Sequence, residues 1–397
     1  RLADMGGDVI IRRGTDADGD GIVELNARWN GADAGAEVAG TLAAPEIGPA
    51  AYAVAVDGSR VVSAVGLLSV RLELAGRSVP VGQPEFVATD PDYRGRGLVR
   101  RLFRVVEQWS DERGDLVQVV AGIPFFYRQL GYQYAIRGAR RCILPTDAAV
   151  PVAEGWTVRP ATAADLAEVR AVQAATQRAS ALQLRFTDEI WPILLGLPHA
   201  PVVVAERDGR IGGTARVALR DGRVRLLAAA ATDAGAARAL VHHGRLVHPG
   251  AGTVVPDRNG SALSELLATV GYPTRERPWL YVRVADPVAL LDHLRPVLTE
   301  RLAGSAFADT RSMELSLYRS RIGLDVVDGS CTSVWGDDGV QAERDDVAAL
   351  PPDLFAELVF GPHGAAGLEE HADVDYGPHR RLMHVLFPPL TTDVQLW

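Results

Sequence analysis

The chain repeats one pattern of residues in its first two thirds, and this repeat limits the folds open to it. The segments DVIIRRGTDADGDGIVELNARW (8–29) and GWTVRPATAADLAEVRAVQAAT (155–176) each predict a short strand, a turn and an amphipathic helix. The residues in step are Arg12, Thr15 and Asp18 in the first copy and Arg159, Thr162 and Asp165 in the second. A duplication at this spacing predicts a pseudo-dimer of two domains rather than a solenoid.

The segments that follow also repeat. AYAVAVDGSRVVSAVGLLSV (51–70) and PVVVAERDGRIGGTARVALRDG (201–222) each predict a strand pair, with turns at Asp57-Gly58 and Asp208-Gly209. We therefore expect a first domain at 1–147, a second copy of it at 148–285 and a third region at 286–397 whose sequence pattern differs from that of the two copies.

The remainder predicts a small α+β domain. PVALLDHLRPVLTERLAG has helical periodicity, SMELSLYRSRIGLDVVDG predicts strands, and LPPDLFAELVFG predicts a helix that opens with prolines. Taken together, the chain is expected to be α/β (α+β), with mixed sheets flanked by helices.

Composition excludes several classes of protein. At 397 residues and 47% hydrophobic content, the chain is large enough for two or three buried cores. No apolar run approaches the ~20 residues of a membrane span, nothing at the N-terminus resembles a signal peptide, and Cys142 and Cys331 lie far apart. The net charge of -9 argues against nucleic-acid binding and permits a cationic substrate. We expect a cytoplasmic protein that binds neither membrane nor nucleic acid.

The segment EFVATDPDYRGRGLVRRLFRVVEQW (85–109) predicts a binding site for phosphate groups. It places an apolar strand and a glycine-containing turn before a helix whose entrance is rich in arginine. The first N–H groups of a helix lack partners, the helix dipole favours an anion there, and glycines allow close approach. The alternative is a turn followed by a solvated basic face. The sequence has neither the Gly-Lys-Ser/Thr of a P-loop nor a full GxGxxG.

The next segment, LVQVVAGIPFFYRQLGYQYA (116–135), predicts a strand, a short helix ending at Gly131 and another strand. The chain resembles the GNAT family of acyl-CoA-dependent N-acyltransferases in the order of its parts. That order is a strand, the motif Arg-x-x-Gly-x, a helix, a second strand and the motif Phe-Tyr-x-x-Leu-Gly-Tyr. The resemblance implies that Phe86, Val87 and Thr89 line the pantetheine arm of acetyl-CoA or another acyl-CoA. It also implies a pyrophosphate cradle made by Arg94, Gly95, Arg96, Gly97, Leu98, Val99 and Arg100. Val99 departs from the family pattern, which has a small residue there.

The tandem layout, with a phosphate loop in the first copy only, resembles the enhanced intracellular survival (Eis) family. The second copy reads LLAAAATDAGAARALVHH (226–243), where no arginine precedes Gly235 at the required spacing and Asp233 would repel phosphate. The resemblance implies a degenerate second GNAT domain, a sterol-carrier-like third domain, a homo-oligomer, and acylation of a small-molecule amine such as a polyamine or aminoglycoside. His242, His243 and His248 have no metal-site spacing, so no metal is expected.

The reaction needs an acid for the leaving thiolate and a base for the amine. By resemblance, Tyr127 is the general acid; the alternative is an aromatic core, which we prefer for Tyr132 and Tyr134. By the same resemblance, the C-terminal carboxylate of Trp397 is the base or an ammonium anchor, with Glu85 as the alternative base.

Glu24 could instead attract a cationic amine. Two other functions stay open: a tailoring enzyme that uses another acyl-CoA or a hydroxyl acceptor, and a CoA-binding protein without turnover.

Overall fold

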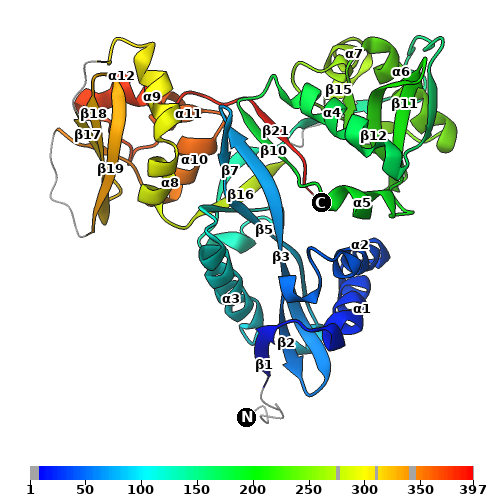
Figure 1. Cartoon of the computed structure of the whole chain (residues 1–397), viewed down its shortest axis with the longest axis horizontal. Coiled ribbons are helices and arrows are strands. Elements are labelled where there is room, and N and C mark those ends of the chain that lie inside the picture. Colours follow the sequence, from blue (N-terminus) through cyan, green and yellow to red (C-terminus); the bar gives the residue numbers. More distant parts are fainter. Residues whose placement is uncertain (1–8, 274–277, 309–311, 339–345, 397) are drawn as a thin grey trace.

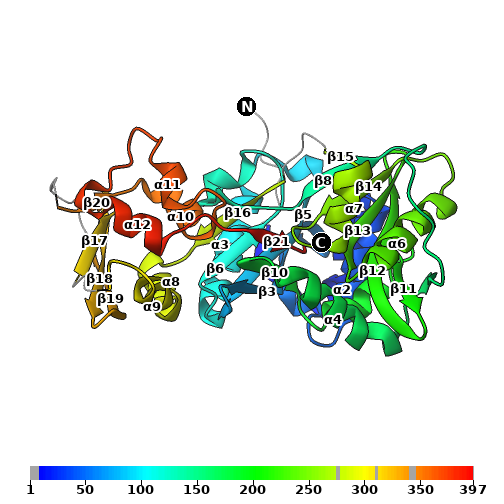
Figure 2. The same ribbon diagram turned by 90° about the horizontal axis from the view of Figure 1, so that it is seen from above.

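The computed structural model describes residues 9–273, 278–308, 312–338 and 346–396 (Figure 1). They form mixed α/β layers in which sheets are flanked by helices, as predicted. The third region and the second sheet lie at opposite ends of the molecule, with the first sheet between them (Figure 2). Within these residues, no helix is both long and apolar enough to cross a membrane.

The first sheet has seven strands along its main path in the described part of the chain. Their order is β1 (Ile10–Arg13), β2 (Tyr52–Asp57), β3 (Arg60–Leu74), β5 (Val81–Thr89), β6 (Val117–Val120), β16 (Trp279–Val284) and β7 (Gln133–Arg137). Neighbours in this order are antiparallel except β5 and β6, which are parallel. The short strand β4 (Arg77–Val79) pairs with β3 beside this path.

Helices cover both faces of this sheet because its strands alternate apolar residues between the two sides. Tyr52 of β2 packs with Leu25 of α1 (Gly19–Trp29) and Val38 of α2 (Ala32–Ala43). The next residue, Ala53, packs on the other face with Phe103 of α3 (Leu98–Arg113). α3 separates the glycine-containing turn from β6.

The second sheet repeats this plan. Its order is β15 (Tyr272–Pro273), β8 (Arg140–Leu144), β14 (Thr253–Asp257), β13 (Arg223–Ala231), β12 (Arg210–Arg220), β11 (Val202–Arg207) and β9 (Thr157–Pro160). Its helices are α4 (Leu166–Gln177), α6 (Ala234–Val247) and α7 (Ala262–Val270), with the short α5 (Ile190–Leu195) facing α2. Both predicted hairpins form; the first turn falls at Gly58-Ser59, one residue later than expected, since Asp57 pairs with Arg60.

The repeated residues make the same contacts in both copies. Arg12 donates two hydrogen bonds to Asp18, at 2.6 and 2.9 Å, and Asp18 also accepts from the backbone and hydroxyl of Thr15. Arg159 likewise donates to Asp165 from Nη1 and Nη2, both at 2.8 Å, and Asp165 also accepts from the backbone and hydroxyl of Thr162. This shared helix cap explains why the same residue types occur at equivalent positions of the two copies.

The two sheets exchange strands across the expected boundary at 147. β8 follows β7 in sequence, yet it pairs with β14 in the second sheet. β16 lies within the expected second copy, yet it pairs between β6 and β7 in the first sheet. β10 (Leu182–Phe186) is also added to the end of β3, and β21 (Thr392–Val394) pairs with β10. Each copy therefore completes the other's sheet.

The third region forms a four-stranded sheet in the described residues, with helices packed on it. Its strands are β19 (Ser330–Asp338), β18 (Ser320–Val327), β17 (Ser312–Ser316) and β20 (Ala348–Ala349), in that order. Its helices are α8 (Pro287–His293), α9 (Arg295–Ala303), α10 (Phe355–Phe360), α11 (Gly364–Leu368) and α12 (Arg380–Leu386). The strands and helices predicted for this region are present, and their core is continuous with that of the first sheet.

Candidate active site

A bulge in β5 opens the first sheet beside β6. Phe86 has a φ of 55°, and the pairing of β5 with β3 shifts by one residue around it. Such a bulge bends the strand and leaves an extra residue unpaired. β5 and β6 pair only at Val81–Val117 and Gly82–Gln118, so the backbone beyond the bulge is left without a partner strand on that side. This opening is where the site lies.

A cavity of about 710 Å³ occupies the opening. Of the residues predicted to bind the cofactor, it is lined by Val87, Thr89, Arg94, Gly95, Gly97, Leu98, Val99 and Arg100. It is also lined by Trp29, Asn30, Ala88, Tyr93, Ile123, Phe126, Gln129 and Leu130, which were not among the residues predicted to bind the cofactor. The strand, the turn and the helix N-terminus thus converge on one cavity.

The turn before α3 exposes the start of this helix. Gly95 and Gly97 have φ values of 74° and 71°, a backbone conformation that favours glycine, and α3 begins at Leu98 with no acidic residue in its first turn. Arg94 donates to the Thr89 carbonyl at 3.4 Å, and Arg100 donates to Gln129 at 3.3 Å. The helix dipole and two guanidinium groups therefore give this end of the cavity a positive potential.

Two of the predicted residues do not line the cavity. Phe86 is 5% exposed, and its side chain packs in the core formed with α1 and α2. Arg96 donates to the Asp92 carbonyl at 2.9 Å and lies over the ring of Tyr93. Phe86 contributes the bulge rather than a contact surface.

Residues at the end of α1 complete the cavity. Asn30 donates to the Val87 carbonyl at 3.2 Å, and Trp29 lies 6.0 Å from the Arg94 guanidinium. An aromatic and an amide residue at a helix end carry no motif spacing, so sequence reasoning missed them. They are identified only by their contacts in the fold, since Asn30 bonds to β5 and Trp29 lies near Arg94 of the turn.

Tyr127 lies in η4 (Phe126–Leu130), the short helix that follows the cavity-lining Ile123. The Tyr127 side chain is 5% exposed. Its ring contacts Phe103, Phe126, Tyr132 and Tyr281 at centroid distances of 5.9, 5.1, 6.1 and 5.5 Å. A methyl group on Gly122 would lie 2.2 Å from the ring, so only glycine leaves it room. Burial, with a contribution from the charge of Glu85, raises the pKa of Tyr127 above its ordinary value.

Glu85 lies immediately before the bulge and is half-buried. Gln83 donates to its carboxylate at 2.7 Å. Burial raises the pKa of Glu85 to about 7, although hydrogen bonds from Gln83 and the Phe86 backbone oppose the shift; the charge of Glu37 adds to it. The charge of Glu85 also contributes to the raised pKa of Tyr127, after the larger effect of burial.

Of the two remaining candidates, the structure describes only Glu24. Glu24 is exposed on α1 and lines a separate hollow with Arg28, Ser59 and Arg60. Trp397 lies outside the described residues; the chain is described as far as Leu396.

The second copy has the same bulge but a different helix start. Ala228 of β13 has a φ of 48° at the matching register shift. Asp233 accepts from the backbone N–H groups of Gly235 and Ala236, at 2.7 and 3.0 Å, and so occupies the N-terminus of α6. Trp156 packs directly over Gly235. This helix end already holds an anion of its own.

Tyr132 and Tyr134 belong to the aromatic core, as expected. Tyr132 is fully buried and donates to Gln118, and Tyr134 stacks on Tyr281 at 4.1 Å. Among the residues that the structure describes, no group of three or more histidine, cysteine or acidic side chains could hold a metal ion.

Comparison with known proteins agrees with this geometry. A profile of the acetyltransferase (GNAT) domain family matches residues 11–135. A search of curated protein sequences finds no match. Among solved structures, the GCN5-related N-acetyltransferase of Kribbella flavida is 20% identical, with a TM-score of 0.65 over 98% of each chain.

Two further structures are similar over almost their whole length. The GCN5-related N-acetyltransferase of Anabaena variabilis is 14% identical, with a TM-score of 0.69 over 97% of this chain and 99% of that one. Eis1 from Mycobacterium abscessus is 17% identical, with a TM-score of 0.63 over 97% and 99%. At these identities the likeness establishes the fold, and the family match covers the segment that forms the cavity. The first part of the chain, residues 11–135, is therefore an acetyltransferase domain of the GNAT family, carried in a fold that the whole chain shares with solved GNAT proteins.

Proposed function

We propose that the chain transfers an acyl group from an acyl-CoA, most simply acetyl-CoA, to an amine of a small polyamine-like or aminoglycoside-like molecule. The observation that carries this proposal is the cavity beside the bulge of β5, bounded by the uncapped start of α3 and followed by the packed Tyr127. Each part suits one portion of an acyl-CoA.

The donor would bind by matching charge and hydrogen-bonding groups. Its pyrophosphate would lie at the start of α3, where the N–H groups of the first turn, Arg94 and Arg100 supply positive potential. Its pantetheine arm would extend along the backbone from Val87 to Thr89, which lines the cavity and does not pair with β6. In the second copy, Asp233 already occupies the N-terminus of α6. This occupancy supports the proposal that each chain has one donor site.

The chemistry would be direct attack. The neutral amine nitrogen bonds to the thioester carbonyl carbon, the C–S bond breaks, and the sulfur leaves with the electron pair. Tyr127 would donate a proton to this thiolate, because its raised pKa keeps it protonated at neutral pH. The proton lost by the amine would go to the Trp397 carboxylate or to Glu85.

The pKa of Glu85 supports its candidacy as that base. A carboxylate with a pKa of about 7 is half deprotonated at neutral pH and accepts a proton more readily than an ordinary glutamate. The role of Trp397 rests on the resemblance to the Eis family alone, since that residue lies outside the described part. The same resemblance is the basis for proposing a homo-oligomer that works in the cytoplasm, which light scattering and cell fractionation would test.

The experiment is an assay of free CoA thiol release. Acetyl-, propionyl- and longer acyl-CoAs would be offered with a panel of polyamines, aminoglycosides and matched alcohols. Release that depends on an amine is the expected result, and its ranking would identify donor and acceptor. Release only with longer donors or alcohols would instead indicate a tailoring acyltransferase. Tight CoA binding with no release from any pair would contradict the proposal.

A further inference from the structure

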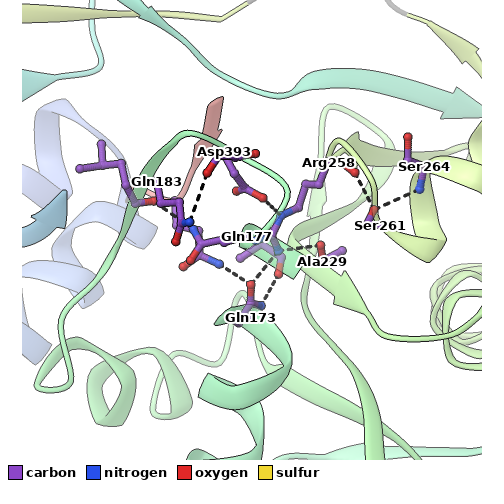
Figure 3. Close-up of polar contacts among 12 residues, drawn as sticks. Gln173, Gln177, Gln183, Ala229, Arg258, Ser261, Ser264 and Asp393 are labelled. Atoms are coloured by element: carbon purple, nitrogen blue, oxygen red, sulfur yellow. Dashed lines mark hydrogen bonds and ion pairs between the residues drawn. The ribbon is translucent and has the colours of Figure 1, made fainter. Parts of the chain in front are cut away.

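A buried polar cluster joins the second sheet to the C-terminal strand (Figure 3). Its members are Arg258, Gln173, Asp393 and Gln395, which are 3%, 4%, 1% and 4% exposed. Arg258 donates from Nε to Asp393 Oδ2 at 2.8 Å and from Nη1 to Gln173 Oε1 at 2.6 Å, and Gln395 donates to the same oxygen. Buried charges persist when they are paired and hydrogen-bonded, so each member depends on the others.

Arg258 lies in the opening that corresponds to the donor cavity. It directly follows β14, as the loop with Ile123 follows β6, and it donates to the Ala229 carbonyl of β13 at 3.0 Å. β13 is bulged at Ala228, and β13 and β14 pair at only two positions, as β5 and β6 do. The gap between the bulged strand and its neighbour opens into the cavity of about 710 Å³ in the first copy. In the second copy, Arg258 reaches from the end of β14 to β13 (Figure 3), and the hollow lined by Ala228 and Val254 is smaller, at about 200 Å³.

The partner of this arginine comes from the end of the chain. Asp393 is in β21, which runs parallel to β10 with Asp393 opposite Gln183, and the Gln395 backbone N–H donates to the Leu184 carbonyl at 2.7 Å. β10 in turn pairs with β3 of the first sheet. The C-terminal strand is thus held at once by the second copy, through side chains, and by an extension of the first sheet, through its backbone.

We propose that the donor opening of the second copy has become a clamp for the C-terminal strand, with Arg258 and Asp393 as positioning residues for the end of the chain. The ion pair selects the register of β21 on β10, because a shift of one residue would turn Asp393 away from Arg258. This inference rests on the proposed function, in which the terminal carboxylate is one candidate base. The clamp residues act through the strand and contact no reacting atom.

The test combines two measurements on the full chain carrying Asp393→Asn or Arg258→Met. Hydrogen exchange of residues 391–396 should become at least tenfold faster, because the strand loses its charged anchor. Turnover should fall at least tenfold, while the KM for acetyl-CoA is unchanged, because the donor cavity is in the other copy. The matched control is Arg140→Gln, which breaks the Arg140–Asp257 pair of the same sheet at 2.6 Å and should leave both measurements unchanged.

A double variant protects the test against misfolding. Arg258→Met with Asp393→Leu removes both charges, so no unpaired charge is left in the interior. It should unfold cooperatively and still show faster exchange of the C-terminal strand and lower turnover. Normal turnover in this folded variant, or unchanged exchange in Asp393→Asn, would overturn the inference. Faster exchange, in a protein that shows no turnover with any donor–acceptor pair, would support the clamp and reject the proposed function instead.

Discussion

Replacing Tyr127 by phenylalanine removes one oxygen from a tightly packed ring. The four aromatic neighbours of Tyr127 and the contact with Gly122 involve the ring, which the variant keeps. Among the described residues, the Tyr127 hydroxyl makes no hydrogen bond that the change would break. The free energy of unfolding should therefore change by less than about 1 kcal/mol, as is usual where no buried partner is orphaned.

The effect on turnover should be far larger. Proton transfer by a positioned acid contributes about 10²–10⁴-fold, which corresponds to about 3–5 kcal/mol at 1.36 kcal/mol for each factor of ten. Tyr127→Phe should lower kcat at least tenfold and leave the Kd for acetyl-CoA unchanged, because a proton donor to the leaving thiolate stabilises the transition state and not the bound donor. Thiol release measures the rate, and calorimetry with CoA measures binding.

Tyr132→Phe is the matched control. Its ring lies 6.1 Å from that of Tyr127, but its hydroxyl donates to the buried Gln118. This variant should lose about 1–3 kcal/mol of stability, because the Gln118 oxygen is left unsatisfied, and should keep its turnover. If Tyr127→Phe retains the wild-type rate, or if both variants lose turnover equally, the assignment of the acid is wrong.

Four further predictions follow from the same site. If Glu85 is the base, kcat should rise with pH around an apparent pKa of about 7, and Glu85→Gln should abolish this rise; an unchanged pH profile would assign the base to another group. Because the pKa of Glu85 is raised in the folded protein, ionisation of this carboxylate destabilises the fold as the pH rises from the ordinary pKa of glutamate toward 7. The variant should therefore gain more stability at pH 8 than at pH 4. Gly122→Ala should displace the Tyr127 ring and lower kcat with little change in acetyl-CoA affinity, whereas a normal rate would show that the ring tolerates the methyl group. Gly97→Val places a branched residue at a φ of 71° and should weaken CoA binding about tenfold, measured by calorimetry, since strain of 1–3 kcal/mol is expected there. Deletion of Trp397 should lower turnover without changing the melting temperature; a lower melting temperature would assign the terminus a structural role.

The sequence by itself determined the local parts of this protein. The duplication is visible because each copy repeats a short-range cap, Arg12 with Asp18 and Arg159 with Asp165, whose residues are six apart. The strand, glycine turn and helix of the first copy were equally readable, since helix starts and turns depend on neighbouring residues. The resemblance carried by this segment identified half of the residues that line the cavity, because that half lies in one stretch of the chain.

Only the tertiary structure decided what lies between distant segments. The exchange of β8 and β16, the closing of the cavity by Asn30, and the ion pair between Arg258 and Asp393 join residues tens to hundreds of positions apart. The pKa of Glu85 likewise depends on how much water the fold removes around it. Sequence patterns report the preferences of neighbouring residues, whereas strand pairing and desolvation are set by packing across the whole chain, and these complete the site.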